Sequence, residues 1–477
     1  MEESIKNKFV KGVIWGVVEK FATLATGFII TLVLARILTP ADYGLVNMIY
    51  IFTVLGTVLL DGGFGQALIQ RKNITRLDAS SVFYINLALS LIIYIILYFS
   101  APLIASFYRQ PSLVLISRIV FITIPISALC IVQHNLLTKD LKVKELTYVS
   151  ILSSLVSGAI GILLAYCGFG VWSLVYQSVI LQLVRTIALW WFSDWRPCFG
   201  FSVKFIRSIW NFSMNLLGVF TLASVFQNIY TLIIGRLYNV NEVGYYNQAF
   251  RMQSVASSAI MSSIQRVAFP AFSKFQDDYQ TLQRTYKRVM LMTMFVYFPF
   301  MMCLIVISTE LFDVLLTNKW LPSVPMFCLL CIAESLYPLN NINSSVLKAV
   351  GKGRDYLVLN IVNYILIIIC IVATYKFGII ALLGGYAVSS VLRSLICMAV
   401  CGREIKYPVY AQLRDLVPVF IITLLTCLTV FFMTKIPNSE FMKLIISSLT
   451  GIVTFIVLNV VMKSQLISEL KALKNKQ

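Results

Sequence analysis

Polar and charged side chains recur at helical spacing inside segments of the sequence that are otherwise apolar. They are Glu19, Thr23 and Thr26 in the first such segment; Asn47, Tyr50, Thr57 and Asp61 in the second; Asn211, Asn215, Thr221, Ser224, Asn228 and Thr231 in the seventh; Asn247, Arg251, Ser254, Ser258 and Ser262 in the eighth; and Glu334, Asn341 and Ser345 in the tenth. Residues three or four apart share one face of a helix. Side chains of these types can bind ions or hydrogen-bond a polar solute. Because they are costly in hydrocarbon, we expect such faces to line a cavity or to contact another helix.

The ionisable side chains differ in how deeply they lie within these segments. The deeper ones are Glu19, Lys20, Arg251 and Glu334. Arg118 and Arg266 lie near segment ends, as do Arg185 and Arg393, and for these the alternative is a long side chain that reaches the membrane interface. For Asp61, which precedes two glycines, the alternative is a kinked helix end. For the Ser and Thr members, the alternative is packing between helices with each hydroxyl bonded to its own backbone.

The elements that must position these residues are transmembrane helices. The chain has 477 residues, is 59% hydrophobic and 12% charged, and has a mean hydropathy of +0.85, whereas soluble domains are about 45 to 50% apolar. A span of the hydrocarbon core takes roughly 20 helical residues. We predict about fourteen spans, near residues 12–35, 44–66, 81–104, 112–136, 147–166, 170–192, 208–234, 244–272, 289–308, 321–347, 356–375, 378–401, 415–433 and 441–462.

The distribution of charge predicts the orientation in the membrane. The net charge is +19, and with both termini in the cytoplasm most Lys and Arg residues fall in cytoplasmic segments. The outer segments hold only Arg36, Arg109, Arg236, Lys319, Lys376, Lys435 and Lys443. This asymmetry follows the positive-inside rule of a bacterial inner-membrane protein. The basic residues are therefore expected to face anionic membrane lipids, and a nucleic-acid partner is not expected.

The cysteines and the first apolar stretch are expected to be structural. The ten cysteines show no metal-like grouping, and as small apolar residues they are expected to pack within helices. No metal or other cofactor is expected. The first stretch is too long for a signal-peptide core and should remain as a helix.

Two stretches of the chain resemble one another at nearly constant spacing. A shift of 200 residues places 34–37 over 234–237 and Gly44 over Gly244, and a shift of 208 places 169–170 over 377–378. Such a pattern indicates two parallel repeats. We predict an N-terminal six-helix bundle over 1–203, a second six-helix bundle over 204–405, and two further transmembrane helices with a basic cytoplasmic tail over 406–477.

The sequence resembles the polysaccharide transporters of the O-antigen and colanic-acid flippase (Wzx) type, within the multidrug/oligosaccharidyl-lipid/polysaccharide (MOP) exporter superfamily. The resemblance rests on LARILTPADYG at 34–44, DGGFGQALIQ at 61–70 and GFGVWSLV at 168–175, and in helix order it covers essentially the whole chain. Val143 departs from the aromatic residue expected after the fourth span. The resemblance implies a MATE-like, all-α fold with two bundles around a cleft, and alternating access by rocking.

The resemblance also implies a substrate and roles for the polar residues. Members move an undecaprenyl-diphosphate-linked oligosaccharide to the outer leaflet for O-antigen, capsule or exopolysaccharide synthesis. A polysaccharide polymerase or glycosyltransferases are the protein partners to expect. Lys20 and Arg251, with Arg118 and Arg266, would bind the diphosphate. The amides expected to face the sugars are those of Asn47, Asn215, Asn228 and Asn247. The acids Glu19, Asp61 and Glu334 would pair with these cations or take up a coupling ion.

Three alternatives differ in what they require of the sequence. A cation-coupled multidrug exporter of the same superfamily should have a mainly acidic, aromatic cavity, whereas basic residues outnumber acids in these spans. A membrane enzyme such as a polysaccharide polymerase would need a large outer loop, and the predicted loops are short. A purely structural membrane protein would not need matched polar faces in both halves. We therefore expect a transporter that is not an enzyme.

Overall fold

The structure is a computed structural model built from α-helices. It describes residues 2–61, 63–276, 278–436 and 439–461, and within these ranges the side chains of 2–11, 13, 259 and 262–271 lie outside the description. The elements are α1 (Glu2–Ile37), α2 (Pro40–Asp61), α3 (Phe64–Gln70), α4 (Arg76–Tyr108), α5 (Leu113–Val120), α6 (Thr123–Lys139), α7 (Val143–Tyr166), α8 (Val171–Phe192), α9 (Val203–Leu237), α10 (Val240–Lys274), α11 (Tyr279–Val306), α12 (Ser308–Leu316), η1 (Asn318–Ser323), α13 (Val324–Glu334), α14 (Tyr337–Ala349), α15 (Gly353–Thr374), η2 (Tyr375–Phe377), α16 (Ile379–Glu404), α17 (Val409–Thr434) and α18 (Glu440–Val461). The described part contains no strand.

The predicted membrane-spanning class is confirmed. Among the described residues, 13 helical segments are long and apolar enough to cross a membrane. The remaining predicted span, 244–272, is helical as part of α10. It is not among the thirteen, and the described part of α10 is rich in Asn, Gln, Ser and charged residues. The polar pattern that singled out this segment in the sequence therefore also sets it apart from the other spans.

The helix boundaries repeat at the two offsets seen in the sequence. At the offset of 200 residues, α1 ends at Ile37 and α9 at Leu237, and α2 begins at Pro40 and α10 at Val240. At the offset of 208, α8 begins at Val171 and α16 at Ile379. The same local signals thus start and stop corresponding helices in each repeat, as duplication in parallel orientation predicts.

The fourth span of each repeat is broken in the middle. In the first repeat it consists of α5 and α6, and in the second of η1, α13 and α14. A proline lies in the first turn of the helix that follows each break, Pro125 in α6 and Pro338 in α14, and its ring cannot continue the hydrogen-bond ladder. The hydroxyl of Thr123 donates to the carbonyl of Val120 at 2.6 Å in the first break, and the hydroxyl of Ser390 on α16 donates to the carbonyl of Ala333 in the second. Side chains therefore satisfy backbone groups that the breaks release.

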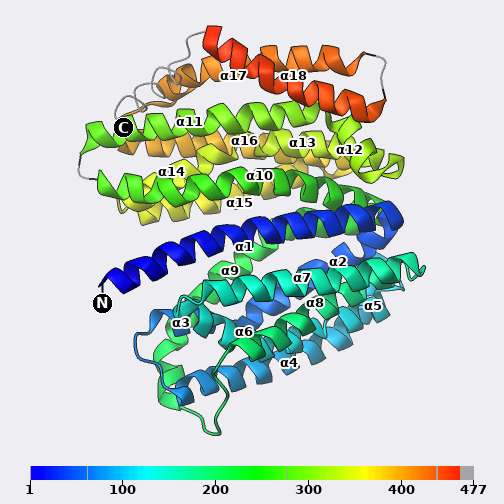
Figure 1. Ribbon diagram of the computed structural model, residues 1–477, viewed down its shortest axis with the longest axis vertical. Coiled ribbons are helices and arrows are strands. Elements are labelled where there is room, and N and C mark those ends of the chain that lie inside the picture. Colours follow the sequence, from blue (N-terminus) through cyan, green and yellow to red (C-terminus); the bar gives the residue numbers. More distant parts are fainter. Residues whose placement is uncertain (1, 62, 277, 437–438, 462–477) are drawn as a thin grey trace. The chain divides into compact units, whose positions relative to one another are not determined.

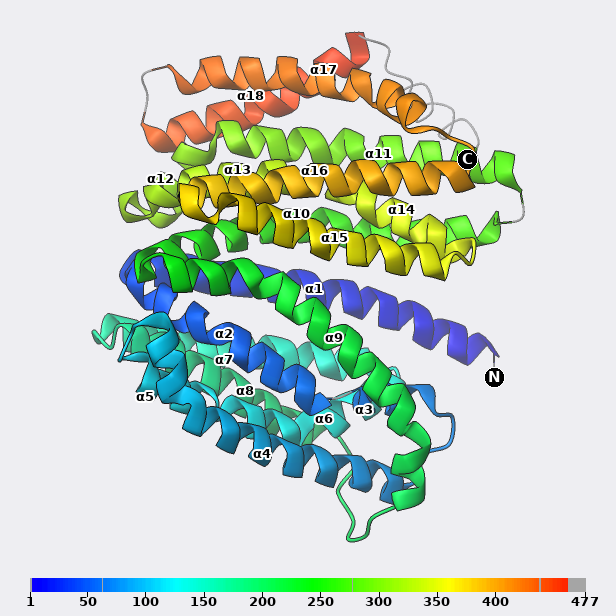
Figure 2. The same cartoon turned by 180° about the vertical axis from the view of Figure 1, so that it is seen from behind.

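The chain divides into two compact units, Met1–Asn247 and Gln248–Gln477. In the first unit, α7 packs against α1 and α8, and α9 crosses α2 and α4 (Figures 1 and 2). In the second, α15 packs on α16, and α17 packs on both α11 and α18 (Figure 1). This division follows packing, whereas the boundaries predicted at 203/204 and 405/406 follow the sequence repeat and stay a prediction.

A buried polar network attaches α17 to the rest of the second unit. The Tyr286 hydroxyl lies 2.8 Å from the side-chain oxygens of both Asn343 and Gln412, and all three residues are fully buried. The Gln412 amide donates to the carbonyl of Tyr407 at 2.7 Å. Lys287 and Asp415 form an ion pair of 2.6 Å between α11 and α17. Because buried polar groups are costly when unpaired, this network specifies one docking arrangement for α17.

We predict that Ser390→Ala lowers the stability of the second unit by about 1 kcal/mol, because the carbonyl of Ala333 loses its side-chain donor. Ser389→Ala is the matched control, since among the described residues the hydroxyl of Ser389 bonds only the carbonyl of Tyr386 in its own helix, at 2.8 Å. Thermal unfolding of the two purified variants in detergent measures the difference. Equal melting temperatures would show that Ser390 does not brace the break.

Candidate functional site

Two glycines allow α2 and α10 to cross with their backbones in contact. A β carbon placed on Gly44 would lie 2.0 Å from the carbonyl oxygen of Val240, and one on Gly244 would lie 2.0 Å from the carbonyl oxygen of Pro40. The contact is reciprocal, and it joins residues that the offset of 200 aligns. Only glycine fits at either position without moving the helices, so the crossing is determined by these two residues.

Three of the four predicted amide residues share one geometry, and two of these three lie close to this crossing in sequence. Asn47 and Asn247 each follow a crossing glycine by three residues, and each donates its side-chain amide to the backbone carbonyl four residues earlier, at 2.8 and 2.9 Å. Asn228 on α9 does the same at 2.9 Å, and Thr231, one turn beyond it, donates to Oδ1 of Asn247 at 3.4 Å. Asn215 lies exposed on α9. The back-bonding fixes these amides and turns their oxygens away from the helix as hydrogen-bond acceptors.

The three predicted acids each have a neutral hydrogen-bond partner. Glu19 accepts from the Ser150 hydroxyl of α7 at 2.8 Å. Asp61 accepts from the backbone N–H of Gly65 at 3.2 Å, so it caps the short helix α3, in line with the alternative of a kinked helix end. Glu334 ends α13 and accepts from the hydroxyl of Tyr386 on α16 at 2.5 Å. Glu334 lies at the break between α13 and α14, directly after Ala333, whose carbonyl accepts from Ser390.

The predicted cations Lys20, Arg118 and Arg251 lie on three different helices and differ in how exposed they are. Lys20 is exposed on α1, which packs on α7. Arg118 on α5 is half-buried, and its guanidinium stacks on the Tyr98 ring at 4.3 Å from the centroid, with Nε unpaired among the described residues. Arg251 is exposed on α10. The side chain of Arg266 lies outside the described residues. A joint role of these cations in phosphate binding stays a prediction.

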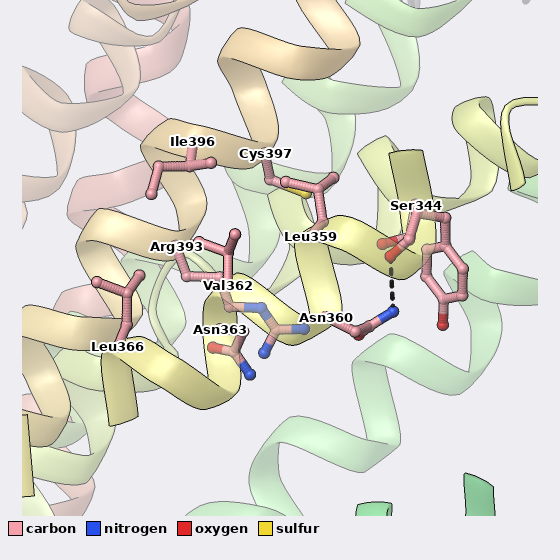
Figure 3. A pocket seen from close by; sticks show the side chains of 10 residues that line it. Ser344, Leu359, Asn360, Val362, Asn363, Leu366, Arg393, Ile396 and Cys397 are labelled. Atoms are coloured by element: carbon pink, nitrogen blue, oxygen red, sulfur yellow. Dashed lines mark hydrogen bonds between the residues drawn. The ribbon is translucent and has the colours of Figure 1, made fainter. Parts of the chain in front are cut away.

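Arg393 belongs to a polar pocket that the sequence interpretation missed. It extends from α16 toward Asn360 and Asn363 of α15 (Figure 3), and Ser344 of α14 also lines the pocket. Asn360 donates to the carbonyl of Tyr356 at 2.9 Å. The space left is about 10 Å³, room for roughly one water molecule. The offset of 208 residues that aligns Arg393 with Arg185 was the available signal, and the position of Arg393 near the helix end left an interfacial side chain as an open alternative.

Two amides in the core of the first unit were also missed. Asn86 on α4 and Gln133 on α6 are fully buried, and neither side chain is hydrogen-bonded to a described residue. The helices that carry them pack together. Asn86 is an isolated amide in an apolar run, whereas Gln133 is followed directly by His134 and Asn135.

The helices and their repeat define a polytopic membrane protein with the fold of the MOP exporters. The lipid II flippase MurJ, in an inward closed conformation, matches this fold with a TM-score of 0.75 at 16% identity, covering 95% of this chain and 100% of that one. The chain belongs to the polysaccharide biosynthesis protein family, whose model matches residues 33–325. It is 27% identical over 425 residues to the teichuronic acid biosynthesis protein TuaB of Bacillus subtilis (strain 168), covering 88% of each chain. It is 24% identical over 417 residues to the lipopolysaccharide biosynthesis protein WzxC of Escherichia coli (strain K12), covering 86% of this chain and 84% of that protein.

We predict that Gly44→Ala and Gly244→Ala each destabilise the protein by about 1 to 3 kcal/mol, because the added methyl group overlaps a backbone carbonyl that cannot move without the helix. Gly27→Ala in α1 is the control, since a β carbon there meets nothing within 4 Å. Fluorescence-detected size-exclusion chromatography after heating compares the three variants. A crossing variant as stable as the control would contradict the close approach of the two backbones.

Proposed function

We propose that this protein flips an undecaprenyl-diphosphate-linked oligosaccharide from the cytoplasmic to the outer leaflet of the bacterial inner membrane by alternating access, during synthesis of a surface polysaccharide. The observation that carries the proposal is the match to the polysaccharide biosynthesis family over 33–325 in a chain with the fold of a lipid II flippase. The concentration of basic residues in one set of loops supports an orientation with both termini in the cytoplasm. The protein partners are a polysaccharide polymerase and the glycosyltransferases that build the substrate.

The polar residues fit the physical problem that this substrate poses. Its sugars and diphosphate cannot cross hydrocarbon, whereas its polyprenyl tail can remain there. Sugar hydroxyls donate hydrogen bonds, and the back-bonded amides of Asn47, Asn228 and Asn247 present acceptor oxygens. The diphosphate needs cations, and Lys20 and Arg251 are both exposed. Protein groups of both kinds thus take the place of the water that the head group loses.

The membrane potential can supply the direction of transport. A diphosphate with about two negative charges gains roughly 2.3 kcal/mol per charge per 100 mV on moving outward from a negative interior. Glu334 is the acid best placed to add ion coupling, because it lies at a helix break and shares a hydrogen bond with a neutral hydroxyl. Such a carboxylate can exchange a proton or bind a cation without disrupting an ion pair.

The two alternatives are less well supported. A multidrug exporter of the same superfamily has the same fold, but the relatives that cover most of this chain are polysaccharide biosynthesis proteins. A polymerase would need catalytic groups outside the membrane, and the described connections between helices are short. Transport without covalent chemistry is the simpler account, and it requires no cofactor.

We predict that deleting the gene abolishes the surface polysaccharide and that wild-type protein restores it, whereas Arg251→Ala does not, because an exposed guanidinium on α10 is lost from the substrate path. Arg284→Ala, which removes an exposed arginine of α11 in the same unit, is expected to restore display fully. Gel analysis of surface polysaccharide, with immunoblots of the membrane fraction, gives the result. Normal display with Arg251→Ala would remove this residue from the path, and normal display in the deletion strain would refute the proposed function.

A further inference from the structure

An open groove lies on the first unit where α3 leads into α4. Its walls are Gln70, Arg71, Lys72 and Asn73 on one side and Ser208, Ile209 and Phe212 of α9 on the other. Its volume is about 590 Å³. The α3 helix packs beside α9 at this end of the unit (Figure 2). By the orientation proposed above, this is the cytoplasmic end.

The loop that forms one wall is held in place from two directions. Lys139 of α6 donates to the backbone carbonyls of Arg71 and Lys72, at 2.5 and 3.3 Å. The guanidinium of Arg71 donates to the backbone carbonyl and the hydroxyl of Ser208 on α9, both at 3.2 Å. One nitrogen of the guanidinium, Nη2, thus bonds to α9 across the groove, and the loop holds its charged side chains at defined positions.

The groove is positively charged. Lys72 is exposed and forms no ion pair with a described residue, and Arg76, Lys204 and Arg207 are exposed on the helices that flank the groove. The nearby acid Asp78 accepts hydrogen bonds from the backbone N–H and hydroxyl of Thr75, at 3.1 and 2.8 Å, as part of the cap of α4. Several cations with amide and hydroxyl donors among them are the groups that bind phosphate oxygens.

The other wall combines a polar and an apolar surface along one helix. Ser208, Asn211 and Asn215 follow one another on α9 at steps of three and four residues, so they share a face, and all three are exposed. Phe212, beside them, is 38% exposed. A molecule with a charged head and an apolar tail could therefore contact cations, amides and an aromatic ring at once.

We propose that this groove captures the diphosphate of the lipid-linked substrate from the cytoplasmic leaflet, before the sugars reach Asn215 and the amides further along α9. The inference rests on the proposed function, and it adds a capture site that uses Arg71 and Lys72. A free inorganic phosphate would gain nothing from Phe212, and a lipid with a single phosphate would gain less from several cations. The groove therefore favours a diphosphate that is attached to a lipid.

The test measures binding of undecaprenyl diphosphate to the full-length protein in phosphatidylcholine nanodiscs. Arg71→Gln combined with Lys72→Gln is expected to weaken binding about tenfold, because charge-assisted hydrogen bonds to phosphate are lost. The matched control is Arg354→Gln combined with Arg403→Gln, which removes the same charge from exposed positions of α15 and α16, and it should stay within about twofold of wild type. Lys72→Gln alone breaks no hydrogen bond between described side chains, so it tests the groove even if the double variant does not fold.

Competition distinguishes the possible ligands. Inorganic diphosphate and phosphatidylglycerol should each displace undecaprenyl diphosphate only weakly, and equal displacement by either would overturn the assignment to a lipid-linked diphosphate. Wild-type affinity in both the double variant and Lys72→Gln would refute the groove as the capture site, and the proposed function would still stand. A wild-type protein that does not bind undecaprenyl diphosphate at all would overturn both.

Discussion

A helix inside a hydrocarbon layer must bond each of its backbone N–H and C=O groups within the protein, because no water is present to do so. The fourth span of each repeat breaks this ladder and depends on side chains to repair it. Thr123 bonds a carbonyl of its own span, and Ser390 reaches across from α16 to α13. In the same units, Thr186 of α8 donates to the carbonyl of Ile126 in α6 at 3.1 Å, and Asn340 of α14 donates to Ser394 of α16 at 3.1 Å. The sixth span thus braces the fourth in both repeats.

The same constraint explains where polar chemistry can lie in this protein. Burying a side chain that already bonds a neighbouring backbone group or hydroxyl costs little free energy of desolvation. Burying an isolated charge costs much more. Asn47 and Asn247 each have such a partner in a backbone carbonyl of their own helix. Glu334 has one in the hydroxyl of Tyr386. Polar groups are therefore retained within the spans as fixed parts of the packing, and their unused acceptor atoms remain available to a solute.

The fold was largely predictable from the sequence, whereas the partners within the site were not. Apolar blocks, basic loops and repeated motifs are local signals, so they predicted the spans and the duplication. Pro125 and Pro338 each lie in the first turn of the helix that follows a break, so the sequence carries a local signal for both broken spans. Glu19 bonds Ser150, which lies more than a hundred residues away in sequence, and such pairing depends on which helices pack together. The crossing of α2 and α10 was marked only by two aligned glycines.

Capture and recognition place different demands on a flippase of lipid-linked glycans. The diphosphate is common to all such carriers, and a flexible or exposed cluster of cations can bind it through charge with little regard for orientation. Many sugars differ from one another in the directions of neutral hydroxyls, so discrimination among them needs acceptors that are held rigidly. Arg71 and Lys72, in the loop beside Ser208, suit capture of the diphosphate. The amides of Asn47, Asn228 and Asn247 suit discrimination among sugars, since each is held by a hydrogen bond to its own helix. Under the proposed function, changes of glycan specificity are therefore expected to concentrate around the amides, while the charge of the groove is retained.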